Sequence, residues 1–75
     1  MPKLPLVSGA KAVKALQRLG FVVDRQRGSL VVMKKITAAG ERGCVIPMHK
    51  EVAIGTLRSA LKLAGVSPEE FSDVL

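Results

Sequence analysis

The chain has 75 residues, which is enough for one domain and too short for a Rossmann, TIM-barrel or other deep cofactor-binding scaffold. Its 12 Lys and Arg residues outnumber its 6 Asp and Glu residues, so the net charge is +6 and a polyanionic or acidic partner is expected. A hydrophobic fraction of 48% argues against intrinsic disorder, and no apolar run approaches the roughly 18 residues of a membrane span. The N-terminus has no apolar signal-peptide core. We therefore expect one cytoplasmic domain over residues 1–75.

The charge is concentrated in the first part of the chain. Residues 1–42 carry nine basic and two acidic residues, a net +7, whereas residues 43–75 carry three basic and four acidic residues, a net −1. This asymmetry favours a polyanion-binding face in the N-terminal part. The alternative is a solvated surface that is basic without binding anything.

The chain opens with an amphipathic helix. Ser8 is a suitable N-cap and Gly20 a suitable stop, which predicts a helix over residues 9–19. Apolar side chains recur at helical spacing on the core side. Basic side chains at positions i, i+3 and i+7 form a solvent-facing stripe, namely Lys11, Lys14 and Arg18.

Strands follow this helix. β-Branched residues predict strands over residues 21–25, 30–36 and 44–48. Turn residues over 27–29 join the first two strands into a hairpin, and a second turn is predicted over 38–43. Pro47 has no N–H to donate, so the third strand either lies at an edge or ends there.

The C-terminal part is helical. A helix opens at Gly55-Thr56 and stops at Gly65, and Ser67-Pro68 with Glu70 forms the start of a short terminal helix over roughly 68–74. The element order predicts an α+β fold, with an α-β-β-β-α arrangement, a three-stranded antiparallel sheet, helices on one face and a short C-terminal helix.

Few side chains offer chemistry. One Cys, Cys44, and one His, His49, do not make a metal-ligand set or a disulfide, so no metal or cofactor is expected. Both aromatic residues, Phe21 and Phe71, are expected in the core, which leaves phosphate contacts and shape as the means of binding a nucleic acid. Imidazole is the side chain that exchanges protons near neutral pH, but His49 is equally explained as a structural residue at a strand end.

Several segments together resemble a known family over most of the chain, from Ser8 to Phe71. They are LQRLGF (16–21), RQRGS (25–29), VIPMH (45–49) and IGTLRSALKLAGVSPEEF (54–71), the last being the most specific. On these segments the chain resembles the HicA toxins of HicAB toxin–antitoxin systems, also called the YcfA family.

The resemblance implies a double-stranded-RNA-binding-like fold and a metal-independent mRNA endoribonuclease that arrests translation. It implies a HicB-like antitoxin that covers the active face, and operator DNA bound only through that antitoxin. It also implies a catalytic His directly after the Gly-Ser of the hairpin, with Gly28 and Ser29 shaping the turn that presents it. That position here is Leu30.

Leucine neither accepts nor donates a proton, so we expect little or no RNase activity from this chain. Leu30 is either an engineered inactivating substitution or the mark of a natural member that binds without cutting. His49 is a secondary catalytic candidate. Phosphate contacts are expected from basic residues of the first helix and the hairpin: Lys11, Lys14, Arg18, Arg25, Arg27, Lys34 and Lys35. The alternative function is a non-catalytic, small basic RNA- or DNA-binding module.

Overall fold

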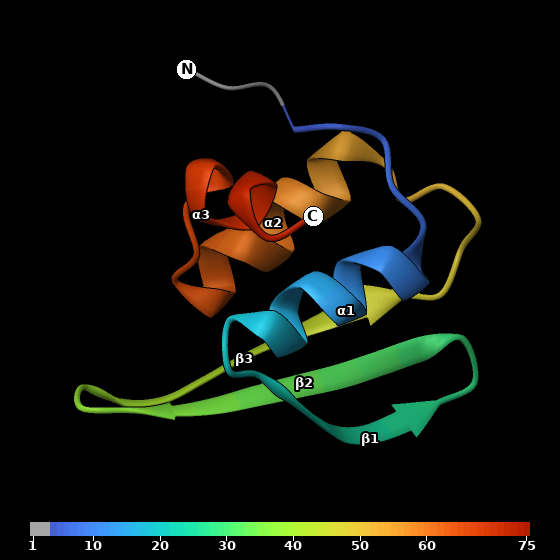
Figure 1. The fold of residues 1–75 in the computed structure, drawn as a ribbon. Coiled ribbons are helices and arrows are strands. Elements are labelled where there is room, and N and C mark those ends of the chain that lie inside the picture. Colours follow the sequence, from blue (N-terminus) through green and yellow to red (C-terminus); the bar gives the residue numbers. More distant parts are fainter. Residues whose placement is uncertain (1–3) are drawn as a thin grey trace.

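The computed structural model describes residues 4–75 as a three-stranded sheet with three helices on one of its faces (Figure 1). The elements in chain order are α1 (Gly9–Arg18), β1 (Val22–Arg27), β2 (Leu30–Thr37), β3 (Gly40–Pro47), α2 (Ile54–Ala64) and α3 (Pro68–Asp73). The α+β class and the predicted order of elements are confirmed. Residues 1–3, on which the expectation about a signal peptide partly rests, lie outside the described residues.

The sheet is antiparallel with β2 at its centre, in the order β1-β2-β3. Across β2 and β3, Val31 faces Ile46 and Met33 faces Cys44, and all four are buried beneath the helices. Because strand side chains alternate between faces, Leu30 and Val32 of β2 lie on the opposite, open face. The sheet therefore has one covered face and one face open to solvent.

Apolar side chains from every helix fill the space above the covered face. Leu16 of α1, Leu57 and Leu61 of α2, and Phe71 of α3 are all almost completely buried. Phe21 is also buried, so the expectation that both aromatic residues belong to the core is confirmed. No polar or charged residue is buried among residues 4–75.

The predicted helix boundaries hold to within one residue. The Ser8 hydroxyl accepts a hydrogen bond from the Lys11 amide at 3.1 Å, and α2 ends at Gly65 with a φ of +72°. Ser67 and Glu70 form a reciprocal capping box at the start of α3. None of the helices within residues 4–75 is long and apolar enough to cross a membrane.

The third strand is longer than predicted. It begins at Gly40 rather than at Cys44, and the turn before it is limited to Ala38 and Ala39. The prediction of a turn over 38–43 was wrong, because residues 40–43 belong to the strand although glycines and charged residues are typical of loops. Gly40 has a φ of +119°, and the Thr37 hydroxyl donates to its carbonyl, so the chain reverses early. Glu41, at the exposed edge, then carries its charge in solvent.

The buried thiol of Cys44 makes stability depend on alkaline pH. Burial raises the pKa of this thiol from 9.0 to about 11. In the unfolded chain the thiol ionises first, so the folded state loses stability as pH rises from 9 towards 11.

Between about pH 8 and about pH 10 this group should remove about 1.3 kcal/mol from the free energy of unfolding. Urea denaturation of the chain and of Cys44→Ala at both pH values measures the difference. The variant should lack this component, and an identical pH dependence in both proteins would contradict the assignment.

Candidate nucleic-acid interface

Three segments that are distant in sequence meet at one end of the sheet. The Met48 amide, just after β3, donates to the Ser29 carbonyl at the tip of the β1–β2 hairpin over 2.6 Å. The Gly9 amide, at the start of α1, donates to the His49 carbonyl over 2.9 Å. We call the place where these segments meet the hairpin-tip junction; it comprises Ser8–Gly9, Gly28–Leu30 and Pro47–His49.

Gly9 allows α1 to approach this closely. A Cβ atom at position 9 would overlap the Pro47 carbonyl oxygen and lie 2.7 Å from the Met48 Cα. Since both neighbours are backbone atoms, they have little room to move away. Gly9 therefore fixes the distance between the helix and the end of β3, a role that local sequence patterns did not signal.

Position 30 is presented to solvent at this junction. Leu30 is the first residue of β2, pairs with Arg27 on one side and Pro47 on the other, and is 44% exposed on the open face. The turn before it depends on Gly28, which has a φ of +57° and open space where a Cβ would be. The Leu30 side chain is therefore outside the core, and it has no group that could form a hydrogen bond.

His49 lies at the same end of the sheet as Leu30. It follows Pro47, the strand partner of Leu30, by two residues, and its side chain is exposed. Its backbone carbonyl is part of the structure, because it accepts the Gly9 amide. The backbone of His49 therefore has a structural role, whereas its imidazole is exposed to solvent.

The basic residues predicted to contact phosphate fall on two surfaces. Lys11, Lys14 and Arg18 form the α1 stripe, which borders a shallow hollow of about 350 Å³ with Val7 and Leu75. Arg18 also donates from Nη1 to the Val74 carbonyl at 2.6 Å, so it ties the C-terminal segment to α1.

The second basic surface is on the open face of the sheet. Arg25 and Arg27 of β1 pair with Val32 and Leu30, which places them on the same face as position 30. Lys34 lies there too, and its ammonium is 3.2 Å from the Glu41 carboxylate and 3.7 Å from that of Asp24. Because the α1 stripe lies on the covered side, the sheet separates the two surfaces.

Lys35 points the other way from Lys34. Its ammonium donates to the Leu19 carbonyl at 2.7 Å, at the end of α1, and lies 5.7 Å from the centre of the Phe21 ring. This lysine therefore caps a helix, a role that its place in a basic sequence did not reveal.

These observations define a small, basic α+β domain with a one-sided sheet and a hairpin-tip junction. The family model described as "HicA toxin of bacterial toxin-antitoxin" matches residues 9–66. The chain therefore belongs to the HicA toxin family, and a toxin–antitoxin partner is implied in general terms. No curated protein sequence matches the chain.

The hairpin-tip junction should fail when Gly9 acquires a side chain. We expect Gly9→Ala to lower the free energy of unfolding by about 3 kcal/mol, because the methyl group overlaps backbone atoms of Pro47 and Met48. Gly55→Ala is the matched control, since a Cβ there meets nothing within 4 Å. It should be neutral or stabilise the helix by about 0.5 kcal/mol. Urea denaturation measures both, and equal effects would contradict the role given to Gly9.

Proposed function

We propose that this chain is a toxin whose fold serves metal-independent mRNA cleavage and translation arrest, and that it is itself inactive because position 30 is leucine. The observation that carries the proposal is the placement of Leu30. It is exposed on the open face, at the hairpin-tip junction, in the position where the resemblance implies a catalytic histidine.

Metal-independent RNA cleavage has few requirements. A base removes the proton from the 2′-hydroxyl, an acid protonates the leaving 5′-oxygen, and cations stabilise the charge that develops on phosphorus. Arg27 pairs directly with Leu30, so a guanidinium is available on the same face. What this position lacks is a group that exchanges protons. We therefore propose that this chain keeps the fold and the ability to bind RNA but does not cleave RNA.

RNA binding in this proposal depends on phosphate contacts. Both aromatic side chains are buried, so neither is available for stacking on bases. Cations are present instead on the α1 stripe and beside position 30. Three of the proposed phosphate contacts already have partners within the chain. Lys35 donates to the Leu19 carbonyl, Arg18 donates to the Val74 carbonyl, and Lys34 is paired with Asp24 and Glu41.

The partner that we propose is a HicB-like antitoxin, with operator DNA bound only through it. The cytoplasm, where mRNA is translated, is the proposed location. We further propose that residues 1–75 act as one domain, because α1, the sheet and both later helices share a single core.

A non-catalytic RNA- or DNA-binding module is the second candidate function. Leu30 favours it for the chain as it stands, since no proton-exchanging side chain occupies the catalytic position of the family. The two candidates differ in one respect: whether an imidazole at position 30 produces a nuclease.

We expect Leu30→His to cleave an unstructured mRNA and the unchanged chain to leave it intact, because the new imidazole supplies proton transfer at position 30. General acid–base groups contribute about 10²–10⁴-fold to such rates. Ile36→His is the matched control, since Ile36 is exposed on the same face of the same strand, six residues from Leu30. Cleavage is followed by gel electrophoresis of a labelled transcript.

Cleavage by the unchanged chain at the rate of Leu30→His would contradict the proposal, and so would equal activity of Ile36→His. Binding is measured separately by titrating salt. For single-stranded RNA the slope of log K against log salt concentration should be about −0.7 for each phosphate contacted. A flat slope would exclude phosphate-based RNA binding.

A further inference from the structure

The loop that carries Lys50 is tied to the segment before α1 by two backbone hydrogen bonds. The Val52 amide donates to the Val7 carbonyl over 2.8 Å, and the Gly9 amide donates to the His49 carbonyl over 2.9 Å. These bonds lie on either side of Lys50 and hold it at the hairpin-tip junction. Lys50 is exposed there, a cation that the sequence pattern did not single out.

Lys50 and the α1 stripe border two adjoining hollows. One has a volume of about 320 Å³ and is lined by Ser8, Lys11, Lys50 and Glu51, together with apolar residues. The other is the hollow of about 350 Å³ beside the α1 stripe, and the two share Val7 and Lys11. We call the two hollows together the α1 groove.

The α1 groove leads to the hairpin-tip junction. In Figure 1, α1 starts at the end of the sheet where β3 finishes and the β1–β2 turn lies, and it runs away from that end. The stripe from Lys11 to Arg18 spans about 10 Å of the helix. Lys50 therefore continues the stripe from α1 to the end of the sheet.

Most of the charge in the α1 groove is not neutralised. Four cations and one carboxylate, that of Glu51, line it within residues 4–75, so its net charge is +3. The ion pairs found in this part of the chain engage Lys34 and none of the four. Arg18 keeps its charge, although Nη1 donates to the Val74 carbonyl.

The hairpin continues the positive charge on the other side of position 30. Arg27 pairs with Leu30, Arg25 pairs with Val32, and both arginines are exposed. Neither takes part in an ion pair with another described residue. The α1 groove lies on the covered side of the sheet and the arginines lie on the open face. The hairpin-tip junction is therefore between two cationic surfaces.

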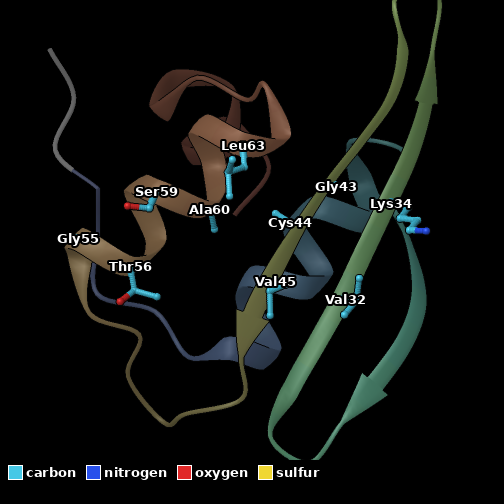
Figure 2. Close-up of a pocket in the computed structure, with 10 residues that line it drawn as sticks. All are labelled: Val32, Lys34, Gly43, Cys44, Val45, Gly55, Thr56, Ser59, Ala60 and Leu63. Atoms are coloured by element: carbon cyan, nitrogen blue, oxygen red, sulfur yellow. The ribbon is translucent and has the colours of Figure 1, made fainter.

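Figure 2 shows a larger hollow, between β3 and α2, that lacks such charge. Its volume is about 600 Å³, and its lining is mostly apolar. Of the described residues, Lys34 is the charged one that lines it, and its ammonium is paired with Asp24 and Glu41. A polyanion is therefore attracted to the α1 groove rather than to this hollow.

We propose that one single strand of RNA turns round the hairpin-tip junction. Its backbone lies along the α1 groove on one side and beside Arg27 and Arg25 on the other. Lys50 contacts a phosphate next to the turn, and position 30 lies just beyond it. This inference rests on the proposed function, because that function supplies RNA as the ligand. It specifies a flexible, single-stranded segment as the substrate.

The sheet between the two surfaces requires the bend. A single strand can follow such a corner, and cationic grooves track the backbone of single strands in other proteins. A duplex is stiff, with a persistence length of about 150 base pairs for DNA, so it would contact one surface at a time. Both aromatic residues are buried, so phosphates rather than stacked bases supply the affinity.

Substitution of Lys50 tests the contact next to the turn. Lys50→Ala should weaken binding of an RNA strand of about 12 nucleotides by about fivefold at about 0.1 M salt, because each phosphate contact adds about 0.7 to the salt slope. Lys62→Ala is the matched control, since Lys62 is exposed on α2 and lines neither hollow of the α1 groove. It should change the affinity little. Fluorescence anisotropy measures both, and equal effects would overturn the inference.

Both variants should keep the fold, because both lysines are exposed. Urea denaturation should therefore give the same midpoint for Lys50→Ala and Lys62→Ala. The slope of log K against log salt concentration is a second measure. It should fall by about 0.7 in Lys50→Ala and stay unchanged in Lys62→Ala.

A comparison of single-stranded and double-stranded RNA tests the bend. Lys50→Ala and Arg27→Ala remove cations on the two sides of the junction. Both should weaken binding of the single strand, whereas at most one should weaken binding of the same strand annealed to its complement. A duplex that loses affinity in both variants would overturn the bend. A single strand that responds to one variant and not to the other would also overturn it.

An acidic polypeptide is the other ligand that a positive groove can attract. Polyglutamate is the probe for this alternative. If it binds as tightly as the RNA strand, and loses as much affinity in Lys50→Ala, the groove is a docking site for acidic protein segments. That result would overturn the inference.

The chain with Leu30 serves in all these measurements, so none of them needs nuclease activity. Binding of RNA that depends on Lys50, together with an inactive Leu30→His, would refute only the nuclease proposal. An active Leu30→His, with equal effects of Lys50→Ala and Lys62→Ala, would refute only the bent path. Absence of salt-dependent RNA binding would refute both.

Discussion

The rest of the structure depends on the close packing of the start of α1 against the end of β3. Gly9 lies so near Pro47 and Met48 that any side chain at position 9 would overlap backbone atoms. Two backbone hydrogen bonds, from Gly9 to His49 and from Met48 to Ser29, then join the helix, the strand end and the hairpin tip. These three segments are far apart in sequence, and their meeting point is where position 30 is presented.

This arrangement separates the core of the fold from the side chain at position 30. The core is formed by apolar side chains on the covered face, whereas Leu30 lies on the open face and is 44% exposed. A change at position 30 should therefore leave the core undisturbed. The α1 stripe lies on the covered side of the sheet, whereas position 30 lies on the open face, so these two parts of the surface can be altered separately.

Most of the fold was predictable from local patterns. The spacing of apolar residues located the helices, and Ser8, Gly65 and the Ser67–Glu70 box fixed their ends because capping is a short-range interaction. The predicted start of β3 was too late, because charged residues such as Glu41 and Arg42 are typical of loops but also occur on exposed edge strands. Their placement depends on pairing with β2, which the local sequence does not encode.

The place of position 30 at the start of the second strand was predictable, whereas its contacts with distant segments were not. The Gly28-Ser29 turn and the resemblance pointed to position 30, but nothing local marked Gly9 as the contact that sets the junction. The basic residues were predicted as one surface, whereas Lys34 and Lys35 point to opposite faces and Lys35 caps α1. Such roles follow from contacts between distant segments, so composition and spacing could not show them.

The central claim is that the hairpin-tip junction presents position 30 independently of the side chain found there. Native-state hydrogen exchange of the Gly9 and Met48 amides, in the chain and in Leu30→His, tests it most directly. The account predicts opening free energies that agree to within about 0.5 kcal/mol, as for an exposed substitution. A loss of more than about 1 kcal/mol at Met48 in Leu30→His would contradict it, because Leu30 would then be a structural residue of the junction.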